Sequence, residues 1–373
     1  MSEPSTQTAG GDTAGDTAFD YTAVDALVDW DLAKRTAGRV VRAGPSIGSG
    51  EAHEVVAQLR DFASRSTGYV ADTTGLLATP GEDVLVVDRA GWVAANVDGF
   101  RAILGPAVAS AQRSRDKAPG GLVQGVGSRV TGTEVGTLLS FLAGKVLGQY
   151  DIAGGSRASG GRLLLVAPNI VQVERELEAV PEDFRLWVCL HEETHRVQFT
   201  ANPWLREHLL AQTRALATDL MGEPGQLADR MAAAARQLPD LLRGGESLGL
   251  LELIQTPEQR AAVARLTAVM SLLEGHADVV MDEVGPQVIP TVASIRRRFT
   301  ERRAGRGAMD RLLRRLLGLE AKMRQYADGA VFVRGAVDAV GMDGFNAVWS
   351  SPDSLPQPQE IADPRAWVRR VHG

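Results

Sequence analysis

Two histidines and the glutamate between them have the residue types and spacing best suited to chemistry in this chain. The pattern His-Glu-x-x-His occupies positions 191–195, as His191, Glu192 and His195. Residues four apart lie on one face of a helix, so both imidazoles can reach one metal ion. Zinc lowers the pKa of a bound water from about 15.7 to about 7, and Glu192 lies where it can take the proton as general base. The spacing therefore indicates zinc-dependent hydrolysis of a peptide or amide bond.

A tetrahedral zinc site needs a third protein ligand in addition to two imidazoles. The extended form of the motif has a third histidine at position 201, which here is Ala201. Glu274 and Asp278 lie one turn apart in a second helical segment, which predicts that Glu274 binds the metal while Asp278 orients a ligand imidazole from behind. His276 is the alternative ligand. On a helix it faces about 200° away from Glu274, so only one of the two can bind the same ion. We favour Glu274, since only Glu274 has a carboxylate partner at this spacing.

Helix signals precede both segments. Pro181 is followed by two acidic residues, a favourable first turn, and apolar residues continue at helical spacing as far as Val197. Residues 256–259, Thr-Pro-Glu-Gln, form a capping box. We expect this second helix to include residues 261–282 and to close at Gly285-Pro286.

Three segments of the chain resemble the zincin-like metallopeptidase family, type 2. They are the run from Arg185 to Leu210, residues 273–282, and Lys322-Met323-Arg324-Gln325-Tyr326. The resemblance covers nearly everything after about residue 25. Members of this family are mostly actinobacterial and are often associated with biosynthesis of the deazaflavin redox coenzyme.

The resemblance implies a zincin-like fold with zinc as the cofactor, in which His191 and His195 are ligands and Glu192 is the general base. Tyr326 lies in the third of these segments and is a candidate hydrogen-bond donor to the developing oxyanion. The alternative for Tyr326 is a buried structural tyrosine.

Two charged residues depart from the stricter zincin helix pattern. Glu193 and Arg196 occupy positions where uncharged residues are usual, and helical geometry turns them toward solvent or toward each other. They keep open a second function class, in which the chain is a catalytically weak or inactive zincin scaffold that acts as a binding or accessory partner.

The predicted fold class is α+β and predominantly α-helical, with a small sheet and an active-site helix. Strands are expected at residues 83–88 and 162–167, both rich in Val and Leu. The second strand is expected to be either an edge strand beside the substrate or a simple buried strand. For domain organisation, we expect a disordered leader over 1–20, an N-terminal helical lobe with short strands over 21–160, and a zinc-binding catalytic lobe with C-terminal helices over 161–373.

Composition excludes several function classes. The net charge of −6 gives no general affinity for nucleic acid or for an anionic membrane. No run of about twenty apolar residues is present, and the first twenty residues do not have the pattern of a signal peptide. Cys189 is the single cysteine, so no intrachain disulfide can form, and we expect it to be a small buried hydrophobe. The motif predicts a peptide or protein substrate as the partner. The lack of a targeting or membrane-spanning pattern predicts a cytoplasmic location.

Two other patterns have simpler explanations. Residues 44–48, Gly-Pro-Ser-Ile-Gly, match the spacing of a serine nucleophile elbow, but no series of parallel strands surrounds them. We expect a helix-capping loop there. Nine arginines lie between Arg296 and Arg315, and a solvated helical face is the expected explanation, because Phe299 is the only aromatic residue among them.

Overall fold

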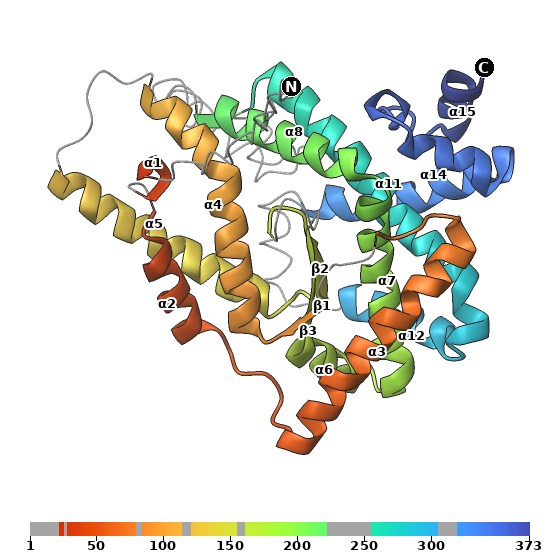
Figure 1. Cartoon of the computed structure of the whole chain (residues 1–373), viewed down its shortest axis with the longest axis horizontal. Coiled ribbons are helices and arrows are strands. Elements are labelled where there is room, and N and C mark those ends of the chain that lie inside the picture. Colours follow the sequence, from red (N-terminus) through yellow and green to blue (C-terminus); the bar gives the residue numbers. More distant parts are fainter. Residues whose placement is uncertain are drawn as a thin grey trace, which may run out of the picture.

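The computed structural model describes residues 22–25, 28–79, 84–113, 121–154, 161–221, 255–304 and 319–373. Within these ranges the chain is mostly helical, and the helices surround one small sheet (Figure 1). The predicted α+β, predominantly α-helical fold class is therefore confirmed. The leader predicted over residues 1–20 lies outside the described residues.

The sheet has three strands in the order β1-β3-β2. β1 (Val84–Val87) runs parallel to β3 (Arg162–Val166), with Val84 opposite Leu163, and β2 (Gly148–Asp151) runs antiparallel to β3, with Gly148 opposite Leu165. The two predicted strands are confirmed. The sheet joins strands from both sides of the predicted lobe boundary at residue 160.

β3 is the central strand, so the hypothesis that it is an edge strand is wrong. Its backbone pairs with a neighbour on each side, and Leu163, Leu164, Leu165 and Val166 are all 0% exposed. A continuous apolar run is typical of a strand that is covered on both faces. The edge strand next to the candidate site is β2, which the sequence analysis did not predict.

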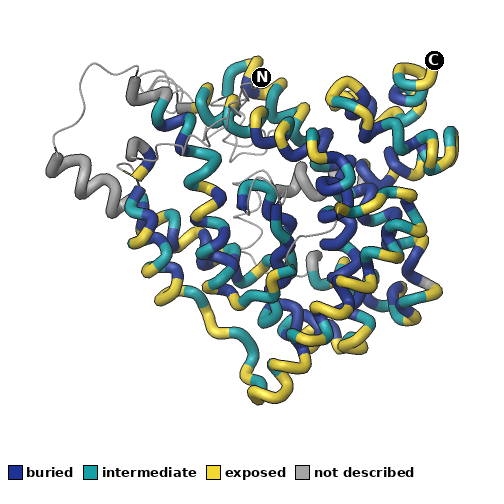
Figure 2. Tube along the Cα trace, in the orientation of Figure 1, coloured by how far each residue is buried: buried dark blue, intermediate teal, exposed yellow. Residues whose placement is uncertain are grey.

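Helices cover both faces of the sheet, and alternate residues of β3 point to different cores. Leu164 and Val166 belong to a core with α2 (Trp30–Val40), α4 (Arg89–Arg113) and α5 (Gly121–Ala143). On the opposite face, Leu165 packs into a core with α3 (Ser49–Thr74), α6 (Ala167–Glu176) and α7 (Pro181–Ala201). Leu163 packs into a third core with α11 (Pro257–Val288) and α14 (Leu319–Phe345). The dark-blue tube in Figure 2 follows these buried segments.

Helix α7 carries the His-Glu-x-x-His pattern and begins at Pro181, as predicted, with Glu182 and Asp183 in its first turn. It packs against α3, and Cys189 on α7 is 0% exposed, as expected for a small buried residue. Asn202 ends α7, and α8 (Pro203–Met221) follows directly.

Helix α11 (Pro257–Val288) carries Glu274 and begins with the predicted capping box. Thr256 Oγ1 accepts from the Gln259 N–H at 3.1 Å, and the Gln259 side chain accepts from the Thr256 N–H at 3.0 Å. The helix was predicted to end at Gly285-Pro286, but it continues through Pro286 to Val288. The Ile289 N–H closes its end by donating to the Gly285 carbonyl at 2.7 Å. Proline removes one backbone donor but does not prevent the turn that follows it.

Helix α14 (Leu319–Phe345) crosses α11 beside Glu274. A Cβ atom on Gly275 would overlap the backbone of Gly329, and a Cβ atom on Gly329 would overlap the Ser271 carbonyl. The two glycines therefore permit a backbone-to-backbone approach that supports α11 at the turn where Glu274 lies.

Short elements complete the described chain: α1 (Thr22–Asp25), α12 (Val292–Ala304), the 3-10 turns Asn346–Trp349 and Pro352–Ser354, and α15 (Pro364–His372). In the described part of the molecule, no helix combines the length and apolarity needed to cross a bilayer.

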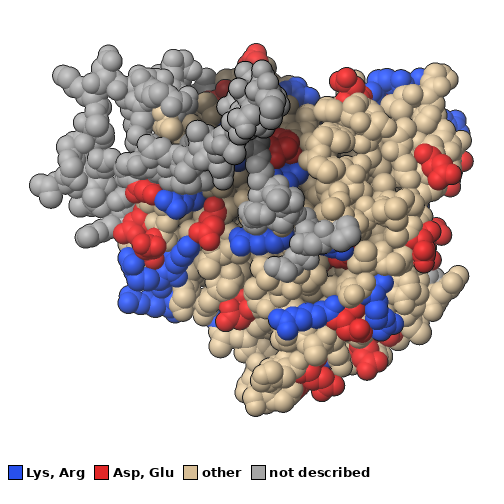
Figure 3. Space-filling view, viewed as in Figure 1, with Lys and Arg blue, Asp and Glu red and all other residues tan. Residues whose placement is uncertain are grey.

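The arginine-rich segment contributes ion pairs within the molecule where it is described. Arg296 lies 2.8 Å from Asp282, Arg302 lies 2.6 Å from Glu176, and Arg298 donates to the Glu178 carbonyl at 3.0 Å. On the face shown in Figure 3, basic and acidic side chains are interspersed over the described surface. These arginines therefore pair internally instead of forming one continuous basic surface.

Candidate metal centre

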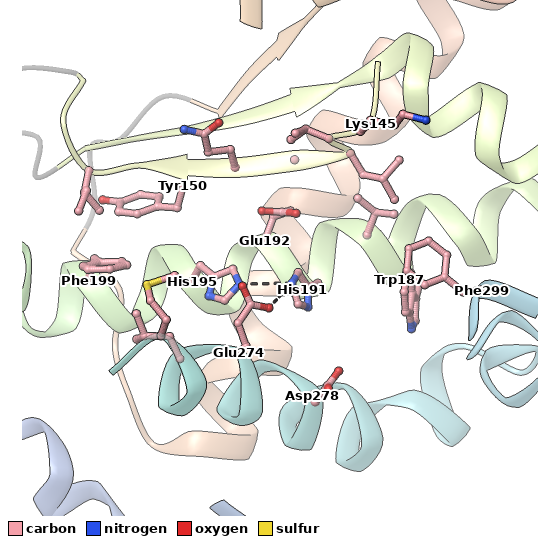
Figure 4. A pocket seen from close by; sticks show the side chains of 18 of the residues that line it. Lys145, Tyr150, Trp187, His191, Glu192, His195, Phe199, Glu274, Asp278 and Phe299 are labelled. Carbon is pink, nitrogen blue, oxygen red and sulfur yellow. Dashed lines mark hydrogen bonds and ion pairs between the residues drawn. The ribbon is translucent and has the colours of Figure 1, made fainter. Parts of the chain in front are cut away.

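The three predicted ligands lie together between α7 and α11 (Figure 4). His191 Nε2 and His195 Nε2 are 3.3 Å apart. A Glu274 carboxylate oxygen lies 3.6 Å from His191 Nε2, and the other lies 3.9 Å from His195 Nε2. Among the described residues, this is the group of histidine, cysteine and acidic side chains whose ligand atoms converge within 4.8 Å.

This donor set fits a zinc ion. Two nitrogens at zinc–nitrogen distances of about 2.0–2.1 Å and a tetrahedral angle lie about 3.3–3.4 Å apart. The observed Nε2–Nε2 separation of 3.3 Å matches that value, and each Glu274 oxygen lies 3.6 or 3.9 Å from one of the two nitrogens. Two imidazoles and one carboxylate leave a fourth position open, which is the arrangement of catalytic and not of structural zinc sites.

His276, the alternative third ligand, lies in the hydrophobic core. It is 0% exposed and its ring stacks on Phe345 and meets Trp349 edge-on, with ring centroids 5.6 and 5.4 Å apart. Burial, and to a smaller extent the neighbouring His195, lowers the pKa of His276 to about 3. The structure therefore brings Glu274, and not His276, to the histidine pair.

Gln198 connects the candidate ligand His195 to the buried His276. Its amide nitrogen donates to the Leu273 carbonyl and to His276 Nδ1, both at 2.9 Å. Its amide oxygen lies 3.0 Å from His195 Nδ1 and accepts that ring N–H. The proton is thereby held on Nδ1, which leaves the lone pair of His195 Nε2 facing the ligand cluster.

Sequence reasoning missed this role of Gln198. The only local signal is that Gln198 lies three residues after His195, which places both on one helical face. The contact to His276 joins α7 to α11 and is not visible in the spacing of either helix.

The orienting role predicted for Asp278 stays a prediction. Asp278 lines the cleft one turn after Glu274, and its carboxylate lies 3.9 Å from Arg296. At the candidate ligand His191, Met281 Sδ lies 3.2 Å from the ring Nδ1.

Glu192 lies on the β2 side of the cluster and is 7% exposed (Figure 4). Burial, and then the charge of Glu274, raises the pKa of Glu192 to about 8. A divalent cation bound at the neighbouring cluster would act in the opposite direction and favour the carboxylate. The β2 backbone approaches Glu192 so closely that a Cβ atom on Gly148 would lie 2.5 Å from its carboxyl carbon.

Glu193 and Arg196 pair with each other on the face of α7 that packs against α3. Glu193 is 0% and Arg196 is 8% exposed, so the alternative that they turn toward solvent is wrong. The Arg196 guanidinium donates to both Glu193 oxygens, at 2.8 and 3.0 Å from Nε, and Thr67 on α3 donates to Glu193 at 2.5 Å. A buried carboxylate with these three hydrogen bonds is compensated, and the pair leaves the candidate ligand cluster on the other face unobstructed.

Tyr326 lies on α14, and its side chain lies outside the described residues. Its predicted role as a hydrogen-bond donor therefore stays a prediction. The serine of the Gly-x-Ser-x-Gly match, Ser46, is exposed in the loop just before α3. This agrees with a loop at a helix start and not with a strand-to-helix elbow.

The cluster opens into a cleft of about 680 Å³, which is lined by residues of β2, α7, α11 and α12. The volume is in the range of pockets that bind small molecules or a few residues of a peptide. A helix with His-Glu-x-x-His, a glutamate from a following helix and an edge strand over the site make up the arrangement expected of a zincin-like site.

The chain belongs to the zincin-like metallopeptidase family, whose sequence model matches residues 28–368. It is also similar to a crystal structure of a protein from Chloroflexus aurantiacus that is described as a proposed hydrolase with a novel fold. The two share 31% identity at a TM-score of 0.66, over 93% of this chain and 99% of that one. No curated protein matches the chain. The predicted family membership is thus confirmed over nearly the whole length.

Proposed function

We propose that this protein is a zinc-dependent metallopeptidase. The observation that carries the proposal is the convergence of His191, His195 and Glu274, with ligand atoms within 4.8 Å of one another, directly beside the buried carboxylate of Glu192. Family membership supports zinc as the cofactor and hydrolysis as the reaction class.

Zinc, when bound by these three residues, supplies a Lewis acid that polarises a carbonyl and makes water more acidic. Glu192 accepts a proton from the attacking water on a carboxylate oxygen and then delivers it to the leaving amine. Its burial between α7 and β2 fixes the position of this carboxylate and limits competing solvent. Gln198 holds His195 in the tautomer that a metal ligand needs.

Strand β2 provides a surface for an extended peptide. In the described sheet it pairs only with β3, so its other edge has no described strand partner and is a candidate for strand addition, a common mode of peptide binding. Gly148 on β2 lies directly against Glu192, so a peptide on this edge has its backbone next to the general base. We therefore propose a peptide or protein as the substrate.

The test is digestion of a random peptide library by zinc-loaded protein, with Glu192→Gln as the matched variant. We expect the wild type to cleave peptides and Glu192→Gln to lose at least about a hundredfold in rate with its zinc retained, because an amide accepts no proton from water. A zinc-loaded wild type without turnover on any peptide would favour the alternative of a non-catalytic scaffold. Equal rates for the two proteins would remove Glu192 from the mechanism.

A further inference from the structure

The two ends of the cleft differ in chemistry. Beyond His195, six apolar side chains line one end, and all of them belong to or pack against a single hydrophobic core. We call this end the Phe199 subsite; its residues are Tyr150, Ile152, Phe199, Leu209, Met270 and Leu273. Tyr150 and Phe199 stack with ring centroids 5.2 Å apart and planes inclined by 15°, which gives this end a rigid aromatic wall (Figure 4).

The other end of the cleft, beyond His191, is mixed. Trp187 and Phe299 provide an aromatic edge-to-face pair there, with ring centroids 5.2 Å apart. Lys145 and Asp278 line the same end (Figure 4), and Arg296, which also lines the cleft, lies 3.9 Å from Asp278. Among the described lining residues, charge is thus confined to this end and to the catalytic cluster, and the Phe199 subsite carries none.

We propose that the Phe199 subsite binds a large apolar side chain, such as Phe, Leu or Met, of the residue next to the bond that is cleaved. The subsite adjoins His195, and one of its residues, Leu273, directly precedes Glu274. A substrate whose carbonyl lies at the metal therefore has its neighbouring side chain within reach of the subsite. Apolar burial against the wall favours binding, whereas a charged side chain would lose its hydration without a described partner. This inference rests on the proposed function and specifies its substrate.

The direct test uses ligands whose binding does not require turnover. N-acetyl-phenylalanine hydroxamate and N-acetyl-glycine hydroxamate share one metal-binding group and differ only in the side chain. Titration calorimetry on zinc-loaded wild type is expected to show that the phenylalanine compound binds at least about tenfold more tightly. Equal affinities would overturn the proposal, and so would failure of both compounds to bind.

A matched pair of variants locates the effect. Met270 lines the subsite and is half-buried, so Met270→Lys places a charge in the wall, and the preference for the phenylalanine compound should fall to about twofold or less. Met342 packs against the same core without lining the cleft, so Met342→Lys should keep the full preference. If both variants reduced the preference equally, the effect would come from the core and not from the subsite.

Peptide digestion separates this inference from the proposed function. Cleavage with Phe, Leu or Met enriched next to the cut supports both, and cleavage without such enrichment refutes the subsite alone. A tenfold hydroxamate preference in a protein that cleaves no peptide would support the subsite and refute the peptidase function.

Discussion

Gly148 on β2 gives the sharpest prediction about catalytic geometry. In Gly148→Ala, the new methyl carbon would lie 2.5 Å from both Cγ and Cδ of Glu192 and 2.8 Å from its Oε1. Carbon atoms in ordinary contact are about 3.5–4.0 Å apart, so one side must give way by about 1 Å. The strand is held by its pairing to β3, where Gly148 lies opposite Leu165 and the Val166 N–H donates to the Leu147 carbonyl at 2.8 Å. We therefore expect the Glu192 carboxylate to move.

A misplacement of about 1 Å at a reacting group costs about a hundredfold in rate, which corresponds to about 2.7 kcal/mol in the activation barrier. The substitution leaves His191, His195 and Glu274 unchanged, so the zinc content should remain one per chain. The expected result is a kcat that falls about a hundredfold at unchanged zinc stoichiometry, measured with the best peptide from the library.

Gly144→Ala is the control, because a Cβ atom at Gly144 would meet only the Phe141 carbonyl, at 3.8 Å. It makes the same chemical change four residues earlier and should keep the wild-type kcat. A Gly148→Ala protein with kcat within twofold of wild type would refute the reasoning about Glu192. Loss of zinc from that protein would show that the close contact supports the metal site instead.

The remaining predictions concern the ligands and the residues behind them. Glu274→Ala should lose stoichiometric zinc while His276→Ala keeps it, and elemental analysis showing the opposite pattern would support a three-histidine site. Gln198→Ala should weaken zinc binding about ten- to a hundredfold, because His195 loses the acceptor for its Nδ1 proton, and an unchanged Kd in chelator competition would contradict this. Asp278→Asn should weaken zinc binding by a similar factor if the carboxylate orients a ligand as predicted, and an unaltered Kd would refute that role. Burial lowers the pKa of His276 to about 3 in the folded protein, below about 6.5 for the unfolded chain, so stability is lost as the pH falls from 6.5 toward 3, by about 1.4 kcal/mol per pH unit. In urea unfolding of metal-free protein between pH 6.5 and 5, the free energy of unfolding should fall by about 2 kcal/mol more for wild type than for His276→Asn. Equal decreases for the two proteins would count against a buried neutral histidine.

The parts of the site that follow from local rules were predictable from the sequence. The i, i+4 spacing of His191 and His195, the proline and acids that begin α7, and the capping box of α11 all act within one helical turn. Glu274 could be selected from its own helix, because it shares a face with Asp278 while His276 points the other way. The structure places it beside the histidines, although the Asp278 role that motivated the choice is untested.

The parts that depend on contacts between distant segments were not predictable. β2 is only four residues long, so its sequence shows too little alternation to indicate an edge strand, and its pairing with β3 joins two segments separated along the chain. The same holds for Gln198, whose amide meets His276 on another helix at 2.9 Å. Glu193 and Arg196 looked like a departure from the catalytic pattern. The sequence of α7 alone does not show that they pair with each other and with Thr67 of α3.

The claim that His191, His195 and Glu274 hold one zinc ion is tested most directly by anomalous X-ray diffraction at the zinc absorption edge, on crystals of the zinc-loaded protein. We expect a single strong peak, about 2.0–2.2 Å from the Nε2 atoms of both histidines and from a Glu274 carboxylate oxygen. A peak at His276, or no peak between α7 and α11, would contradict it.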